Sequence, residues 1–162
     1  MHCGTSPAWV NLIDAESGLY NRLHLVHFLT EAFARARRYG GPLACALFRA
    51  TWWRGLEEMR ELPAGAVRSL GRFLLLGVRE GDILGRWSEG EFLLVAPSTG
   101  REGARACLEK ILGRLDAAPP ALAEGWAVSL RAGEAGLPED AERLRYPEDL
   151  PLLAHDRLVA SR

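Results

Sequence analysis

Thiols are the first side chains in this sequence that could take part in chemistry. Cys3, Cys45 and Cys107 are odd in number, far apart and surrounded by apolar residues. This pattern is typical of small buried side chains in a reducing cytoplasm, and it argues against a disulfide framework. His2 beside Cys3 could bind a metal ion, but its position at the terminus favours a frayed chain end. We therefore expect no metal and no cofactor.

Arginines are the second group of candidates. Arg79 and Asp82 stand three positions apart, a spacing that allows a local ion pair or a cap at a helix end. Arg35, Arg37 and Arg38 lie on the polar side of an amphipathic segment and could contact phosphate, although such a face is usually solvated. Spacing alone leaves both questions open.

The composition limits the classes of protein to consider. The chain has 162 residues, of which 48% are hydrophobic and 25% charged, with a net charge of -1. A domain of about 150 residues buries roughly 70% of its unfolded surface, so it needs no disulfide or metal to fold. A nearly neutral chain creates no strong field for nucleic acid or anionic membrane. We expect one cytoplasmic domain with neither kind of partner.

Apolar periodicity predicts the elements that must position these side chains. It indicates four helices, at 25–36, 66–78, 104–115 and 149–161, the last with Asp149 as its N-cap. It also indicates four strands, at 43–48, 83–87, 92–96 and 126–130, the middle two forming a hairpin with residues 88–91 as its tip. Residues 133–146 are expected to form a loop with one helical turn at 139–144. This order predicts an α/β fold of the α+β type, a mixed sheet flanked by helices.

Four short motifs also follow one another along the chain. Residues 14–22 read D-A-E-S-G-L-Y-N-R, residues 86–92 read R-W-S-E-G-E-F, residues 128–130 read V-S-L, and residues 154–162 form the closing segment. In this order they resemble the motifs of GGDEF domains, the diguanylate cyclase family of bacterial signalling. The resemblance covers residues 14–162, leaves residues 1–13 as an N-terminal extension, and implies a nucleotidyl cyclase-like fold.

The resemblance also points to positions where this chain lacks the family's catalytic residues. Diguanylate cyclases join two GTP molecules with the help of a divalent metal held by two carboxylates. Arg49 and Gly90 stand where the family has those carboxylates. The two leading glycines of the signature are replaced by Ser88 and Glu89, while Glu91 is kept. The resemblance thus implies a vestigial active site without a metal, and a domain that is not an enzyme.

The family's guanine-binding residues are missing as well. They align with Glu57 and with Ala64 or Ala66, and an alanine cannot form a hydrogen bond with a base edge. We expect Arg49 and Glu91, on adjacent strands, to pair across the emptied metal pocket. The alternative for Glu91 is a solvated turn residue.

Two adjacent tryptophans flank this region. Trp53 occupies the family's phenylalanine position and is expected in the core. Trp52 is expected either to fill part of the vacated nucleotide pocket or to lie partly exposed. Arg162, at the position of the family's closing lysine, could retain weak affinity for anions.

The resemblance gives Arg79 and Asp82 a second interpretation. In many GGDEF domains an R-x-x-D motif binds cyclic di-GMP as a product-inhibition site, and here Asp82 stands six positions before Ser88, as in the family. Our leading hypothesis is a catalytically inactive GGDEF-like signalling domain, and one hypothesis within it is a receptor for cyclic di-GMP through Arg79 and Asp82. The alternatives are a protein-interaction scaffold with a protein partner or a second copy of the chain, and, as a minor one, a residual diguanylate cyclase or GTP-binding domain.

Overall fold

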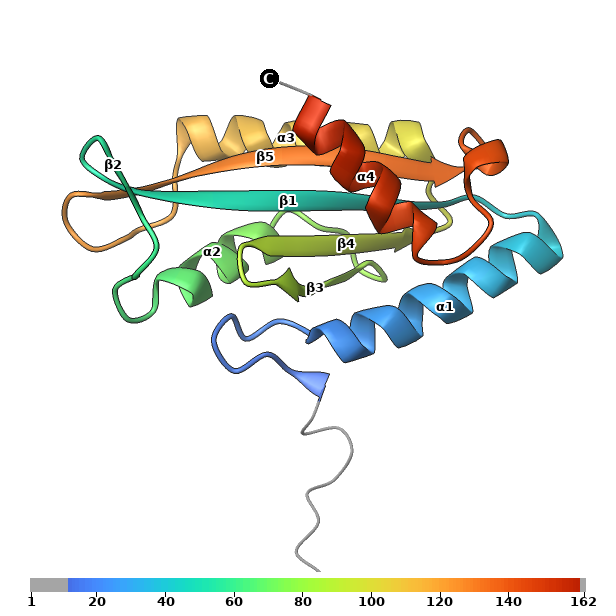
Figure 1. Ribbon diagram of the computed structural model, residues 1–162, viewed down its shortest axis with the longest axis horizontal. Helices are drawn as coiled ribbons and strands as arrows, with labels where there is room; N and C mark the ends of the chain where they lie inside the picture. Colours follow the sequence, from blue (N-terminus) through green and yellow to red (C-terminus); the bar gives the residue numbers. More distant parts are fainter. Residues whose placement is uncertain (1–11, 161–162) are drawn as a thin grey trace, which may run out of the picture.

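One long central strand, β1 (Leu43–Arg54), organises the computed structural model, which describes residues 12–160. β4 pairs with the first half of β1 on one side, β5 pairs with its whole length on the other, and β3 lies beyond β4 (Figure 1). β2 folds back on the far end of β1. The remaining strands, each antiparallel to its neighbours, are β2 (Glu57–Met59), β3 (Ile83–Ser88), β4 (Glu91–Pro97) and β5 (Trp126–Leu137).

Helices cover both faces of this sheet, which confirms the expected α+β class and the nucleotidyl cyclase-like architecture. α1 (Arg22–Tyr39) and α4 (Asp149–Ala160) pack on one face, and α2 (Ala66–Leu75) and α3 (Arg101–Ala117) pack on the other. Side chains of β1 alternate between these two cores, as the pleat of a strand requires. Leu43, Cys45 and Leu47 face α1 and α4, whereas Ala46, Phe48 and Trp52 face α2 and α3.

The clearest predicted helix is confirmed as α1. It begins after Asn21, whose side chain accepts a hydrogen bond from the backbone N–H of His24, and it ends at Gly40 in the left-handed conformation with φ of 76°. Its inward residues are the predicted apolar ones. The helices predicted at 66–78 and 104–115 are confirmed as α2 and α3, although α2 ends at Leu75.

Three expectations about the strands and α4 are wrong. β5 continues to Leu137, so residues 133–137 are strand, and β1 continues to Arg54. Gly133 was a poor loop signal because it allows close packing: a Cβ there would collide with the carbonyl oxygen of Ala154 on α4. The expected helical turn is confirmed as a short 3-10 helix, Ala141–Arg143. The carboxylate of Asp149 accepts the N–H groups of Arg145 and Tyr146, upstream of α4, and so does not act as the expected N-cap.

Several residues of interest lie outside the described part of the chain. These residues are His2, Cys3 and Arg162, so the metal hypothesis for the first two and the anion hypothesis for the third stay predictions. Within residues 12–160, no helix has the length and apolar character needed to span a membrane.

Candidate functional site

The hairpin of β3 and β4 carries the signature positions. Its turn consists of Glu89 and Gly90, while Ser88 and Glu91 are strand residues that lie opposite each other across a register shift. The predicted four-residue tip is therefore two residues long. The Ser88 hydroxyl donates a hydrogen bond to Glu91 Oε1 at 2.8 Å, which orients that carboxylate.

Arg49 and Glu91 form the pair expected from the sequence. They are direct partners in the β1–β4 register, and Arg49 Nη2 lies 3.0 Å from Glu91 Oε2. The neighbouring Ala50 N–H bonds to the Gly90 carbonyl, so Arg49 and Glu91 occupy a non-hydrogen-bonded position, where facing side chains approach most closely. Only 14% of the Glu91 side chain is exposed, which excludes the alternative of a solvated turn residue.

His155 of α4 completes this cluster and was missed by sequence reasoning. Its Nε2 lies 2.7 Å from Arg49 Nη2 and 3.7 Å from Glu91 Oε2. A guanidinium can only donate, so Nε2 accepts and the ring proton of the neutral imidazole lies on Nδ1. The cluster thus faces α4. The alternation of β1 explains this, because Arg49 shares its face with Leu47.

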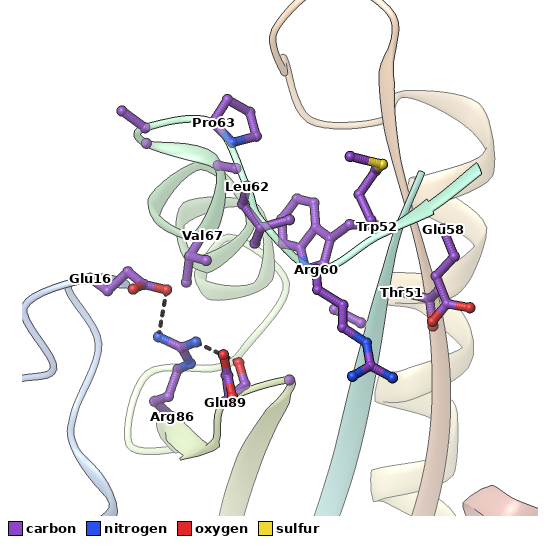
Figure 2. Close-up of a pocket in the computed structure, with 16 residues that line it drawn as sticks. Glu16, Thr51, Trp52, Glu58, Arg60, Leu62, Pro63, Val67, Arg86 and Glu89 are labelled. Atoms are coloured by element: carbon purple, nitrogen blue, oxygen red, sulfur yellow. Dashed lines mark hydrogen bonds and ion pairs between the residues drawn. The ribbon is translucent and has the colours of Figure 1, made fainter. Parts of the chain in front are cut away.

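A cavity of about 520 Å³ opens on the opposite face of the sheet, at the start of α2 (Figure 2). Glu89 and Gly90 of the hairpin line it, and so do both alanines at the aligned guanine-binding position. Trp52 is 7% exposed and lies in the lining, which excludes the alternative of a partly exposed side chain. That it fills part of a vacated nucleotide pocket stays a prediction. The full lining is Glu16, Ala50, Thr51, Trp52, Glu58, Met59, Arg60, Leu62, Pro63, Ala64, Gly65, Ala66, Val67, Arg86, Glu89 and Gly90.

The expectation that Trp53 lies in the core is wrong. It is only partly buried, and its indole Nε1 donates to Ser129 Oγ at 3.0 Å on the neighbouring strand. It points to the opposite side of β1 from Trp52, near a strand end that no helix core encloses.

The charges around the cavity suit a triphosphate poorly. Arg86 is held internally: Nη1 lies 3.3 Å from Asp14 and 3.1 Å from Glu16, and the carbonyls of Ser88 and Glu89 accept its other donors (Figure 2). Burial alone would raise the pKa of Asp14, but hydrogen bonds from Ser17 and the charge of Arg86 lower it overall.

The remaining charged side chains of the lining are the carboxylates Glu58 and Glu89 and one cation, Arg60. A phosphate chain in this cavity would meet at least as much negative as positive charge.

Arg79 and Asp82 lie outside this cavity, in the turn between α2 and β3. The Asp82 carboxylate accepts the backbone N–H of Arg79 at 3.2 Å, and the Asp82 N–H donates to the Arg79 carbonyl at 3.1 Å. The two residues thus form a local contact within this turn, but not a helix cap, because α2 ends at Leu75. The guanidinium of Arg79 forms no hydrogen bond or ion pair with any other residue of the 12–160 segment. Burial raises the pKa of Asp82 above its ordinary value.

Cys107 and Lys110 of α3 interact with groups of this turn. The thiol of Cys107 donates to the carbonyl of Gly77 at 3.6 Å. Burial and the charge of Asp82 raise its pKa, and the positive charges of Arg79 and Lys110 oppose the shift. Arg79, Asp82 and Lys110 are thus close enough to act on the same thiol. Lys110 was missed because only the packing of α3 brings it to this turn.

The element order and the signature hairpin define a domain of the nucleotidyl cyclase class. A family model described as "Diguanylate cyclase, GGDEF domain" matches residues 11–146, and the chain therefore belongs to the GGDEF domain family. Among curated proteins, it is 28% identical over 110 residues to the diguanylate cyclase DgcP of Pseudomonas aeruginosa. That alignment covers 67% of this chain and only 16% of DgcP.

Solved structures share the fold at low identity. The GGDEF domain of FimX from Pseudomonas aeruginosa has a TM-score of 0.76 and 21% identity, with 93% of both chains covered. The GGDEF domain of DgcB from Caulobacter crescentus, solved with c-di-GMP, has a TM-score of 0.72 and 16% identity, covering 99% of this chain and 91% of that one. SiaD of Pseudomonas aeruginosa, solved with its activator SiaC, has a TM-score of 0.72 and 20% identity, covering 94% and 59%.

Proposed function

We propose that this GGDEF domain is catalytically inactive and acts as a cytoplasmic signalling module that binds cyclic di-GMP. The observation that carries the first part is the Arg49–Glu91–His155 cluster. At the position of one metal carboxylate it has a guanidinium, which is positively charged, donates hydrogen bonds and cannot bind a cation. The retained glutamate already accepts from Arg49 and Ser88. Arg49 and Glu91 are therefore committed to protein contacts, and Gly90, at the position of the second metal carboxylate, has no side chain that could bind a cation.

The cavity supports the same proposal. Its guanine-binding positions are alanines, and its hairpin wall presents the Glu89 residue where the family has glycine. Bringing a triphosphate next to a carboxylate without a counterion is unfavourable. Arg86 would have to give up its contacts with Asp14 and Glu16 to compensate.

Binding of cyclic di-GMP is supported by the geometry of the Arg79 turn. Asp82 is fixed by backbone hydrogen bonds, while the exposed guanidinium of Arg79 is available to a ligand, with Lys110 nearby as a second cation. An arginine fork can bind a guanine Hoogsteen edge or a phosphate, and a carboxylate can accept from guanine nitrogens. The related DgcB domain was solved with this nucleotide.

Calorimetry with cyclic di-GMP tests this part. We expect about two nucleotides bound per domain, as the family's stacked ligand requires. Arg79→Ala should weaken binding roughly 10- to 150-fold, the value of a charged hydrogen bond. Arg54→Ala is the matched control, because Arg54 is also exposed but ends β1 at the opposite end of the sheet. Equal binding by Arg79→Ala and the unmodified protein would place the ligand elsewhere. The absence of heat at saturating nucleotide would leave the protein-scaffold hypothesis in its place.

A cyclase assay tests the first part. With GTP and magnesium or manganese, the protein should form no cyclic di-GMP above a no-enzyme control. Even a single preorganised charge interaction is commonly worth about 10² to 10³ in rate, and two metal ligands are replaced here. Product that disappears in Glu91→Ala would show an active site that we have misread.

A further inference from the structure

The outer edge of β5 is a long unpaired strand edge. β5 pairs with β1 along all twelve residues on one side. No other strand within the described residues pairs with its outer side, and β5 is the last strand of the sheet in Figure 1. A strand edge of this length offers a row of backbone donors and acceptors to another chain.

The alternation of hydrogen bonds along the sheet shows which way the backbone groups of each β5 residue point. In an antiparallel sheet, alternate residues of a strand bond to one neighbouring strand, and the residues between them bond to the other. The Ala50 N–H donates to the Gly90 carbonyl beside β4. The backbone N–H and C=O groups of even-numbered β1 residues therefore point to β4, and those of odd-numbered residues point to β5. The β1–β5 register pairs Ala46 with Glu134, an even residue with an even one. Odd residues of β5 therefore bond to β1, and the N–H and C=O groups of its even residues point outward.

Some outward groups near the end of β5 are already satisfied by residues outside the sheet. Arg157 donates to the carbonyl of Glu134 at 2.8 Å, and Asp140 accepts the N–H of Gly136 at 2.9 Å. The Gly136 carbonyl also accepts the N–H of Asp140, so Gly136 is closed, whereas the Glu134 N–H has no hydrogen-bond partner among residues 12–160. At the other end, the Trp126 N–H donates to the Ala123 carbonyl.

Between these closed ends lies an open stretch. The outward groups of Val128, Leu130 and Ala132 have no hydrogen-bond partner among residues 12–160. The stretch contains no proline and a single charged residue, Arg131, so it lacks the usual protection of a sheet edge. The opposite edge of the sheet is covered: Tyr20 bridges to Gly85 on β3 and accepts the N–H of Arg86 at 2.8 Å.

We infer that this open stretch of β5 pairs antiparallel with the same stretch of a second copy of the chain. The stretch is symmetric about Leu130. Pairing Leu130 with its counterpart sets Val128 opposite Ala132 and satisfies the outward groups of these three residues in both copies. It also sets Trp126 opposite Glu134, whose satisfied groups match: the Trp126 N–H and the Glu134 carbonyl, which would pair in this register, already have partners in each copy. The Trp126 carbonyl and the Glu134 N–H, which have no partner among residues 12–160, face each other. The second copy is thus the partner whose own open and closed positions match this edge.

Charge supports the same register. The odd residues form the close, non-hydrogen-bonded pairs, and in this register Arg131 of one copy faces Ser129 of the other. The two arginines do not meet. Both side chains lie on the face of β5 toward α4, where Arg131 Nη2 donates to the Leu158 carbonyl and Ser129 accepts from Trp53.

Light scattering and sedimentation of the full chain, without nucleotide, test the inference over a wide concentration range. We expect a reversible dimer. Val128→Pro removes an outward N–H but no β1 ladder bond, and it should weaken the dimer about 10-fold or more because two hydrogen bonds are lost by symmetry. Val128→Ala is the matched control, since it trims the same side chain and keeps the N–H. A protein that is monomeric at every concentration refutes the inference.

Substitution of exposed Ser129 tests the register without altering the backbone. Ser129→Glu should tighten the dimer by facing Arg131 of the second copy, whereas Ser129→Lys should weaken it, each by about 2- to 5-fold. Outward amides of Leu130 and Ala132 should gain hydrogen-exchange protection only at dimer concentrations. A dimer that is unchanged in folded Val128→Pro, or that gives Ser129→Glu and Ser129→Lys equal affinities, uses another surface.

Discussion

Arg157 should contribute more to the stability of this domain than any exposed ion pair of the chain. Its guanidinium makes two hydrogen bonds to the Asp140 carboxylate, at 2.8 and 2.6 Å, and a third to the Glu134 carbonyl. The side chains of Arg157 and Asp140 are 21% and 5% exposed. Arg157→Met keeps the chain length but removes both of its hydrogen bonds to the buried carboxylate, which keeps only Arg101, at 3.8 Å, as a cation. Breaking a buried pair from one side costs about 3–5 kcal/mol.

Urea unfolding followed by circular dichroism measures this loss, and the melting temperature should fall by roughly 6–20 °C for a domain of this size. Arg105→Met is the matched control. Arg105 and Glu109 form an i,i+4 pair at 3.4 Å with side chains 62% and 65% exposed, and its loss should cost less than about 0.5 kcal/mol. Similar losses in the two variants would refute the reasoning.

The same contact predicts a dependence on pH. Burial alone would raise the pKa of Asp140, but the hydrogen bonds from Arg157 and Gly136 and the charges of Arg157 and Arg101 lower it below its ordinary value of 3.8. A lowered carboxyl pKa stabilises the folded state above the unfolded value and loses that effect as the pH falls through the folded value. The difference between the unmodified protein and Arg157→Met should therefore be full at pH 7 and shrink below about pH 4. A difference that does not change with pH would contradict this.

Two further predictions concern packing and thiols. Gly133→Ala should destabilise the domain by about 1–3 kcal/mol, because the new methyl group would collide with the Ala154 carbonyl and displace α4; urea unfolding checks this. In a variant carrying Cys3→Ser, a thiol reagent should label Cys107 and leave Cys45 unlabelled until the protein unfolds. Burial raises the pKa of both thiols, but Cys45 is fully buried whereas Cys107 is partly exposed. Rapid labelling of both residues in the folded protein would contradict this prediction.

Periodicity predicted most of the fold, and it failed where one residue type has two uses. Helices α1 and α3 followed directly from apolar residues three and four apart. Glycine, however, is typical both of turns and of strands that another backbone approaches closely, and the sequence does not separate the two. Gly133 and Gly136 have the second use, because α4 and the start of α3 lie against them.

The candidate site could be predicted from the sequence only where the pairing and alternation of strands determine which side chains meet. Arg49 and Glu91 pair because they stand on adjacent strands, and the alternation that buries Phe48 also buries Trp52 and leaves Trp53 partly exposed on the other face. That parity was a usable signal for the tryptophans. No such signal pointed to His155. It is 106 positions from Arg49 in the chain, and only the packing of α4 across the sheet brings the two side chains together.

The charge of Arg49 also bears on the proposal that this domain needs no cation at the hairpin. Two facing carboxylates on β1 and β4 repel each other and require a metal ion or a proton to be stable. With arginine on β1, the pair is neutral by itself, and the second carboxylate oxygen of Glu91 accepts a hydrogen bond from Ser88. A return to aspartate at position 49 would therefore set a second carboxylate against Glu91 beside His155, and would weaken the hairpin unless a cation bound there. An arginine at this position therefore fits the proposed function, in which the domain works through its surface and not through GTP.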